Sequence, residues 1–280
     1  MTPSAERLIR GRRFRASDPP VIDESNVPSK CLSFTIAADW GHFRRVDRTV
    51  TKQTYPLPPR TTVAGILASI VGVGRDDYYE IFGPDVSAIS IELQDPVRTM
   101  PMASLGLSTD PEATFERAGG TGRKTVQVKY PDSTAPRQRH SYHYLVNPVY
   151  RIDVAVEHAD FYGTLRQRLQ TGTSFYPPTM GLSELLASIE WHGEYEPTPV
   201  TEDSPVSVDS ALPDAVESIV PQRGQSYTVE RVPGYMTAES GGRKTTTVLD
   251  YAFRKDAGAI KATRDELSPV SVDDRVLVFE

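Results

Sequence analysis

The side chains that could do chemistry in this 280-residue chain are mainly basic. Six Lys or Arg residues between 117 and 140 stand against one acid, Asp132, and glycines in this stretch allow a backbone to approach a ligand closely. Basic residues near glycines and aromatic rings are typical of contacts to phosphates and unpaired bases. The predicted RNA contacts are His42, Phe43, Arg44, Arg45, Arg48, Arg60, Arg117, Arg123, Lys124, Lys129, Arg137 and Arg139.

Two of these residues have distinct expected roles. Phe43 follows a predicted strand end, so it could stack on an unpaired base or instead fill the core. Arg60 stands at the start of a predicted helix, whose free N–H groups would help it to hold a phosphate, with solvation as the alternative.

The charge distribution agrees with a local nucleic-acid contact although the net charge is −6. Residues 1–140 hold 19 Lys/Arg against 16 Asp/Glu, a balance of +3, and residues 141–280 hold 12 against 21, a balance of −9. Arg outnumbers Lys 24 to 7, which favours bidentate phosphate contacts and stacking on bases. The acidic, Lys-poor composition also fits a protein adapted to high salt, where short-range Arg contacts survive charge screening.

Other chemistry finds little support in the sequence. The single cysteine, Cys31, excludes a disulfide framework and a cysteine-based zinc site. The five histidines lack metal-site spacing, and the glycine clusters lack the context of a nucleotide-binding loop. We therefore expect no metal, cofactor or catalytic residue. The sequence has no apolar run long enough for a membrane span, and its Arg-rich start lacks the apolar segment of a secretory signal, so we expect a cytoplasmic protein without membrane contact.

The elements that must position the basic residues follow from periodicity. A strand is predicted at 30–38, a helix at 60–71, strands at 86–98 and 142–156, a helix at 160–169, and a strand or helix at 185–195. This order predicts an α+β, ferredoxin-like (RRM-like) core with a long insertion. We expect a disordered basic tail at 1–29, an RNA-binding domain at 30–197 with its insertion at about 99–140, and a small β-rich C-terminal region at 198–280.

One internal similarity relates residues 55–70 to 175–189, because both contain Pro-Pro and end in Leu-Ala-Ser-Ile. It could reflect two related halves or chance.

Several short motifs carry a family resemblance. They are Ala37-Ala38, Gly41-His42-Phe43-Arg44 and the run from Tyr55 to Ala68, followed by Asn147-Pro148-Val149-Tyr150-Arg151 and Pro177-Pro178-Thr179-Met180-Gly181-Leu182. This ordered set, over roughly residues 30–190, resembles CRISPR-associated protein family five, a branch of the repeat-associated mysterious proteins. The acidic composition looks most like a type I-B member from a haloarchaeon.

The resemblance implies a ferredoxin-like core with a thumb-like β-ribbon and a non-catalytic role in a type I Cascade effector complex of antiviral defence. The subunit would bind and cap the 5′ handle of crRNA. It would sit beside a repeated backbone subunit and a large PAM-sensing subunit, and would meet target DNA only indirectly.

Two alternatives remain open. Type I-C members of the family are metal-independent endoribonucleases that process pre-crRNA with a tyrosine, a lysine and a histidine. Here Tyr55 and His140 would stand near two of those positions, but Arg139 stands where the lysine would be and is a poor proton donor. The second alternative is a scaffold subunit that binds only protein.

Overall fold

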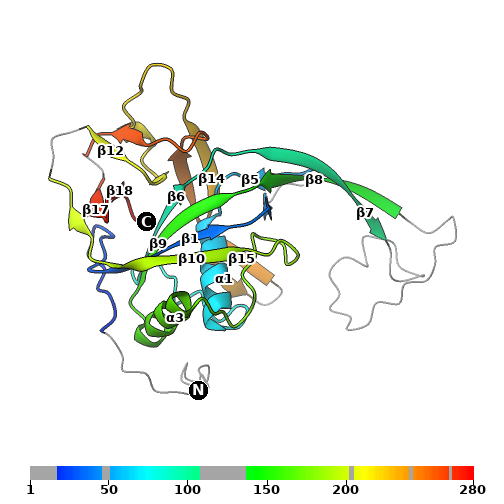
Figure 1. Ribbon diagram of the computed structural model, residues 1–280, viewed down its shortest axis with the longest axis horizontal. Helices are drawn as coiled ribbons and strands as arrows, with labels where there is room; N and C mark the ends of the chain where they lie inside the picture. The colour runs from blue at the N-terminus through cyan, green and yellow to red at the C-terminus, as the bar shows by residue number, and fades with distance from the viewer. Residues whose placement is uncertain (1–17, 46–50, 108–136, 202–204, 240–241, 265–266) are drawn as a thin grey trace.

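The computed structural model describes residues 18–45, 51–107, 137–201, 205–239, 242–264 and 267–280. Its central feature is a four-stranded antiparallel sheet in the order β10-β1-β9-β6 (Figure 1). The strands are β1 (Cys31–Ala37), β6 (Ser87–Leu93), β9 (Val149–Val156) and β10 (Ser188–Tyr195). Helix α1 (Arg60–Val71) connects β1 to β6, and α3 (Ala159–Thr171) connects β9 to β10. The fold is therefore α+β, with mixed sheets and few helices in the described residues.

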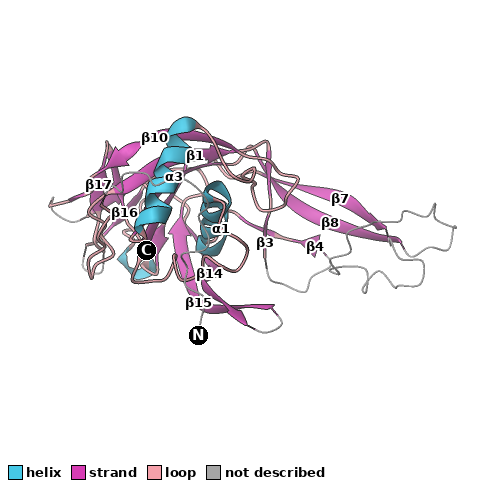
Figure 2. Ribbon diagram, turned by 90° about the horizontal axis from the view of Figure 1, so that it is seen from below, coloured by secondary structure: helices cyan, strands magenta, loops and turns pink. Residues whose placement is uncertain are grey.

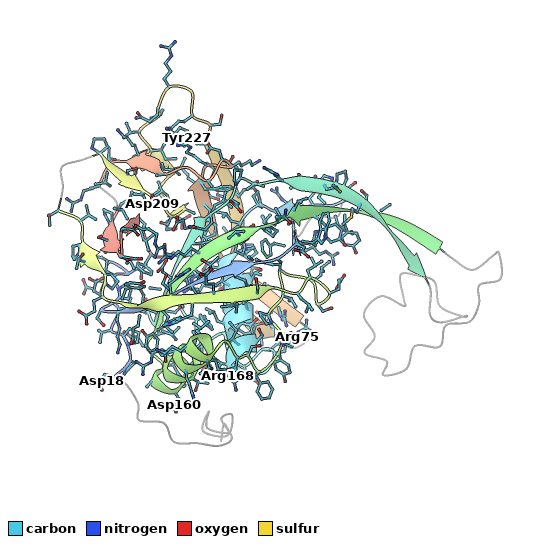
Figure 3. The ribbon with its side chains drawn as sticks, in the orientation of Figure 1. Asp18, Arg75, Asp160, Arg168, Asp209 and Tyr227 are labelled. Carbon is cyan, nitrogen blue, oxygen red and sulfur yellow. The ribbon has the colours of Figure 1, made fainter. Side chains whose placement is uncertain are left out.

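Both helices begin and end as their sequences predict. Helix α1 follows Pro59 and ends at Gly72, which adopts φ 94° and donates its N–H to the carbonyl of Ala68. The predicted helix at 60–71 is thus confirmed, and that at 160–169 is one turn or less too short. In α3, Asp160 lies in the first turn and Arg168 in the last (Figure 3). Each charge is opposite in sign to the nearby end of the helix dipole and therefore stabilises the helix.

The sheet buries both of its faces. Alternate β1 residues Leu32, Phe34 and Ile36 belong to the core that also contains the apolar sides of α1 and α3, and both helices lie on the same side of the sheet (Figure 2). On the opposite face, Cys31 packs with residues of the C-terminal strands. Burial, with the carboxylate of Asp153 as a further cause, raises the pKa of the Cys31 thiol.

The C-terminal region is rich in strands, as predicted, but it shares its cores with the rest of the protein. Its elements are β11 (Thr198–Pro199), β12 (Val206–Val208), β13 (Leu212–Pro213), the 3₁₀ helix η2 (Val216–Ser218), β14 (Thr228–Glu239), β15 (Gly242–Phe253), β16 (Ile260–Ala262), β17 (Val270–Val272) and β18 (Arg275–Leu277). The β14–β15 hairpin packs on α1 and contributes Val232 and Leu249 to the main core, whereas β17 and β18 cover the other face of the sheet.

A buried ion pair fastens this C-terminal segment to the central sheet. The guanidinium of Arg275 on β18 donates to both carboxylate oxygens of Asp153 on β9, at 2.8 and 2.9 Å, and to Glu92 on β6 at 3.0 Å. Desolvation raises the pKa of Glu92. The sheet and the segment over it are therefore joined by charge as well as by apolar packing.

Part of the predicted disordered tail is folded. The carboxylate of Asp23 accepts hydrogen bonds from the backbone N–H groups of Ser25 and Val27, which closes a turn. The N–H of Ile22 donates to Glu157, and its side chain packs beside Cys31. The tail prediction is therefore wrong for residues 18–29, because local turn chemistry and one apolar anchor order them. Residues 1–17 lie outside the described part of the chain.

A β-ribbon projects from the body (Figure 1). It consists of β7 (Thr99–Leu107) paired antiparallel with β8 (Arg137–Val146). The other edge of β8 pairs with the short strands β2 (Trp40–Gly41) and β4 (Thr51–Lys52), and β3 (Phe43–Arg44) pairs with β5 (Thr54–Tyr55). The single strand region predicted at 142–156 is two strands, because Asn147 adopts φ 49° and turns the chain before Pro148.

Candidate nucleic-acid interface

Five large apolar side chains gather on one face of the ribbon, at its base. In the β7–β8 register Met100 lies opposite Tyr144 and Met102 opposite Tyr142, so these four share a face. The Tyr142 and Tyr144 ring centroids are 6.0 Å apart, with planes 33° from parallel. Trp40 on β2 meets Tyr144 edge-on at 6.3 Å. We call Trp40, Met100, Met102, Tyr142 and Tyr144 the aromatic shelf.

A buried histidine lies against the shelf. The His42 ring centroid is 5.2 Å from that of Tyr142 and 5.7 Å from that of Tyr144, and the residue is 1% exposed. Its Nδ1 lies 2.9 Å from the carbonyl oxygen of His143, which can only accept, so Nδ1 carries the proton. Nε2 then presents a lone pair, for which the described residues supply no donor. Burial lowers the pKa of His42 and keeps the ring neutral.

Cationic side chains lie around the shelf. Lys52 on β4 is level with Tyr142 in a parallel pair. Arg98, two residues before Met100, is exposed, and its carbonyl accepts from Val146 at the base of β8. Arg44 on β3 is also exposed. The acidic Glu184 also lies within electrostatic reach of Tyr144 and His42. Rings with cations on neighbouring strands can contact bases and phosphates of a single strand together.

Arg45 has partners within the chain. Its guanidinium lies 3.0 Å from the carboxylate of Glu230 on β14 and 5.1 Å from the ring centroid of Tyr55. Arg45 therefore joins the β3–β5 pair to the C-terminal hairpin, although about a third of its side chain remains exposed.

The structure corrects three of the predicted RNA contacts, because His42, Phe43 and Arg60 are buried. Phe43 packs in the main core, 5.9 Å from the ring of Tyr150, so it takes the core-filling role. His42 lies beneath the tyrosines of the shelf rather than at the surface.

Arg60 is 1% exposed and points into the protein. Its guanidinium donates to the carbonyls of Phe82 and Ser87 at 2.8 and 3.1 Å, and to the Ser87 hydroxyl at 2.6 Å. It also lies 4.2 Å from the centroid of the Tyr235 ring. The helix start was predicted correctly, but its arginine holds a loop and a hairpin together instead of facing solvent.

The remaining predicted contacts are not described at the side-chain level. Arg48, Arg117, Arg123, Lys124 and Lys129 lie outside the described residues. The backbones of Arg137 and Arg139 are on β8, opposite Leu107 and Leu105, which places both residues on the ribbon.

Of the alternative catalytic pair, Tyr55 and His140, the structure describes the side chain of Tyr55. Tyr55 is 8% exposed and belongs to the main core, beneath the guanidinium of Arg45. His140 lies on β8 opposite Ser104, and its side chain is outside the described part.

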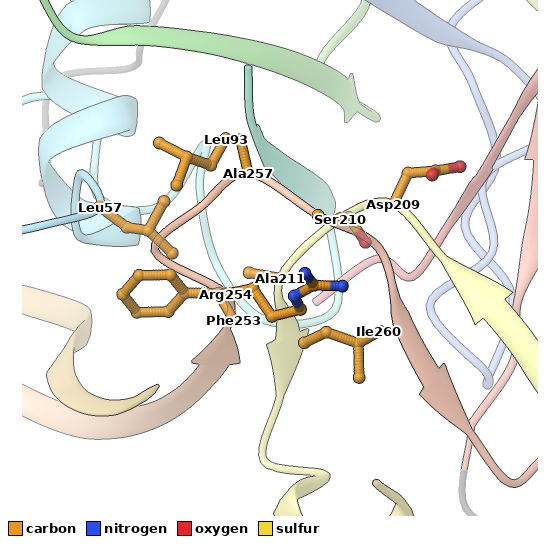
Figure 4. Close-up of a pocket in the computed structure, with 10 residues that line it drawn as sticks. Leu57, Leu93, Asp209, Ser210, Ala211, Phe253, Arg254, Ala257 and Ile260 are labelled. Atoms are coloured by element: carbon orange, nitrogen blue, oxygen red, sulfur yellow. The ribbon is translucent and has the colours of Figure 1, made fainter. Parts of the chain in front are cut away.

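The described residues give little support for a metal site, a membrane span or a small-molecule site. No three His, Cys, Asp or Glu side chains there come together as a metal site requires, and no helix there is long and apolar enough to cross a membrane. A small pocket with an internal volume of about 10 Å³ lies between Leu93 and the C-terminal region (Figure 4). Its cation, Arg254, is 2.6 Å from the Asp256 carboxylate and also donates to Ala259. A cavity needs roughly 10–15 Å³ to hold one water molecule, so we assign this pocket no ligand.

The aromatic shelf was not among the binding residues predicted from the sequence, in which Tyr142 and Tyr144 fall within the strand predicted at 142–156. Its signal was the alternation of Tyr142 with Tyr144 and of Met100 with Met102, which repeats large apolar residues on one face of each strand. Nothing in the sequence showed that these two strands pair in this register, or that Trp40 joins them.

Comparison with known proteins identifies a family to which the chain is similar. Residues 31–242 match the family described as "CRISPR-associated protein (Cas_Cas5)". No curated protein matched the chain. Among solved structures, a chain of a CRISPR RNA-guided surveillance complex is similar, at 16% identity and a TM-score of 0.50, over 83% of this chain and 91% of that one.

Two further similarities are weaker. A chain of a type III-B Cmr-beta complex bound to cognate target RNA has 12% identity and a TM-score of 0.44, over 82% of this chain and 86% of that one. A functionally uncharacterized protein from Streptococcus mutans has 10% identity and a TM-score of 0.36, over 82% and 91%. Since the family match alone covers most of the chain, this protein belongs to the CRISPR-associated Cas5 family.

Proposed function

We propose that this protein is a non-catalytic subunit of a type I CRISPR Cascade complex that binds and caps the 5′ handle of crRNA. The observation that carries the proposal is the family match over residues 31–242. The strand order β10-β1-β9-β6 with crossing helices α1 and α3 supports a ferredoxin-like core. We assign the β7–β8 ribbon as the base of the family's thumb.

The surface chemistry supports RNA as the ligand. The ribbon places the shelf rings and the cations Arg44, Lys52 and Arg98 in one region, which suits single-stranded RNA. We further propose a cytoplasmic, type I-B protein from a haloarchaeon. A repeated backbone subunit and a large PAM-sensing subunit would be its neighbours, and target DNA would be met only through them.

A non-catalytic role is supported by Tyr55, which is buried in the core beneath Arg45 and is thus poorly placed to reach a 2′-hydroxyl. Processing of pre-crRNA by Tyr55 and His140, and a scaffold role without RNA, are alternative outcomes of the test below.

The test incubates the purified full-length chain with its cognate repeat RNA at high salt in EDTA, beside an unrelated RNA of equal length. We expect preferential binding of the 5′ handle without cleavage, for wild type and for the Tyr55→Phe and His140→Ala variants. Arg44→Ala should weaken binding and reduce the slope of log K against log salt by about 0.7. Metal-independent cleavage lost in either variant would make the protein a processing ribonuclease, and absence of RNA binding would favour the scaffold.

A further inference from the structure

The aromatic shelf faces away from the core. Residues of β8 alternate, so Leu145 between Tyr144 and Val146 points to the opposite face, where it is buried in the main core. Met100 on the shelf is 45% exposed, and Trp40, Met102, Tyr142 and Tyr144 are partly exposed. Core packing therefore explains Leu145 but not the five large apolar side chains on the outer face. Such a surface usually has a binding partner.

The shape and charge of this surface favour a nucleobase over an apolar protein segment. Tyr142 and Tyr144 stand two residues apart on an extended strand, which is how sheet-based RNA-binding domains present stacking rings. Exposed Arg98 at one end and Lys52 beside Tyr142 supply positive charge along the same strands. A base stacked on the rings would bring its flanking phosphates towards these cations.

A second observation comes from beneath the rings. The neutral His42 keeps an unpartnered acceptor, Nε2, that is buried against Tyr142 and Tyr144. A buried acceptor without a donor is unfavourable, so such atoms mark places where a ligand or water completes the hydrogen bonding.

We propose that the aromatic shelf is a stacking site for an unpaired nucleobase of single-stranded RNA, formed by the rings of Trp40, Tyr142 and Tyr144 and extended by Met100 and Met102. This inference rests on the proposed function, because it assigns a specific contact to the RNA that the protein is proposed to bind. The site reads the face of a base, so it tolerates different bases at the stacked position.

The two tryptophans of the chain, Trp40 and Trp191, allow a direct test. In a Trp191→Phe background, Trp40 is the sole tryptophan, and a base stacked near its ring should quench its fluorescence. The probe is the single-stranded cognate repeat RNA, titrated into the full-length protein. We expect quenching on binding, and a loss of affinity of roughly 5- to 150-fold in Tyr144→Ala, the range for one lost stacked base.

The controls separate stacking from folding. Tyr176→Ala removes an aromatic ring that is 51% exposed and lies outside the shelf, and it should bind RNA like the wild type. If Tyr144→Ala melts early, Met100→Glu serves instead, because Met100 is exposed and a carboxylate there would repel the RNA without disturbing the core. Single abasic substitutions scanned along the RNA should reveal one position where base loss weakens wild-type binding but not Tyr144→Ala binding.

The possible outcomes distinguish a failure of the stacking site from a failure of the proposed function. RNA binding without quenching, with Tyr144→Ala and Met100→Glu both at wild-type affinity, would overturn the shelf and leave the proposed function standing. Complete absence of RNA binding by the wild type would overturn both. Fluorescence quenching, together with a loss of RNA affinity in Tyr144→Ala and wild-type affinity in Tyr176→Ala, would establish the stacking site.

Discussion

Replacing Arg60 by alanine should destabilise the protein, although the sequence alone suggests a phosphate contact. The substitution removes three hydrogen bonds to Phe82 and Ser87 and the cation over the Tyr235 ring. Each buried acceptor left without a donor costs about 1–3 kcal/mol, and breaking a buried ion pair by removing one partner costs about 3–5 kcal/mol.

The ion-pair part of this cost is reduced by geometry and by protonation. The Arg60 Nε lies 3.8 Å from the nearer Glu280 oxygen, which is long for a strong pair. Burial raises the pKa of Glu280 to about 7, although Arg60 lowers it, so losing Arg60 would favour the neutral carboxyl further. These effects do not add fully, and we expect a total loss of about 3–5 kcal/mol.

The assay is thermal unfolding followed by circular dichroism, alongside RNA binding by fluorescence anisotropy. A loss of this size should lower the melting temperature by roughly 6–20 °C. Arg44→Ala is the matched control, since Arg44 is exposed and should change stability by less than about 0.5 kcal/mol. An Arg60→Ala variant that melts like the wild type but loses RNA affinity would refute the buried structural role.

Three further predictions concern Glu280, Arg275 and Gly181. Glu280 has a pKa of about 7 in the folded protein, above its ordinary value of 4.5. Its protonated form therefore stabilises the fold fully below pH 4.5, and this contribution of about 3 kcal/mol is lost as the pH rises through 7. Glu280→Gln should flatten the dependence of the melting temperature on pH between about pH 5 and 8, and an unchanged pH profile would count against this. Arg275→Ala should cost about 3–5 kcal/mol in urea unfolding. The double variant with Asp153→Ala should recover part of this loss, because only the partly exposed Glu92 carboxylate then lacks its partner. A purely additive double variant would contradict this. Gly181→Ala should destabilise by more than 1 kcal/mol, because φ is +98° and a Cβ would overlap the carbonyl of His42; a wild-type melting temperature would exclude that clash.

The sequence predicted the elements that have strong local signals. The apolar positions of 60–71, with Pro59 before and Gly72 after, identified α1 to the residue, since capping and periodicity act within one helix. The strand positions of the central sheet and the β-rich C-terminal region were also recognisable. The tail at 18–29 was wrongly predicted because a single turn and one partly buried side chain, Ile22, have too little compositional signal.

Local sequence could not decide the conformation of the repeated Leu-Ala-Ser-Ile segment. Residues 67–70 lie within α1, but residues 186–189 run into strand β10. In the second copy Ser188 and Ile189 pair with Ala37 and Ile36 of β1, and Ala187 donates to the carbonyl of Pro178. These distant partners hold the second copy extended, so any relation between the two stretches is not one of secondary structure.

By itself, the sequence determined the α+β class, the first helix, the concentration of basic residues in the first half and the family resemblance, because each depends on residue type and short spacing. Only the tertiary structure decided which of the basic residues face solvent. Arg60 became a buried anchor, and Trp40, Met100 and Tyr144 came together as a shelf, because the pairing of β2 and β7 with β8 joins segments up to about 100 residues apart in the chain. Burial and register are properties of those long-range pairings, and no local pattern encodes them.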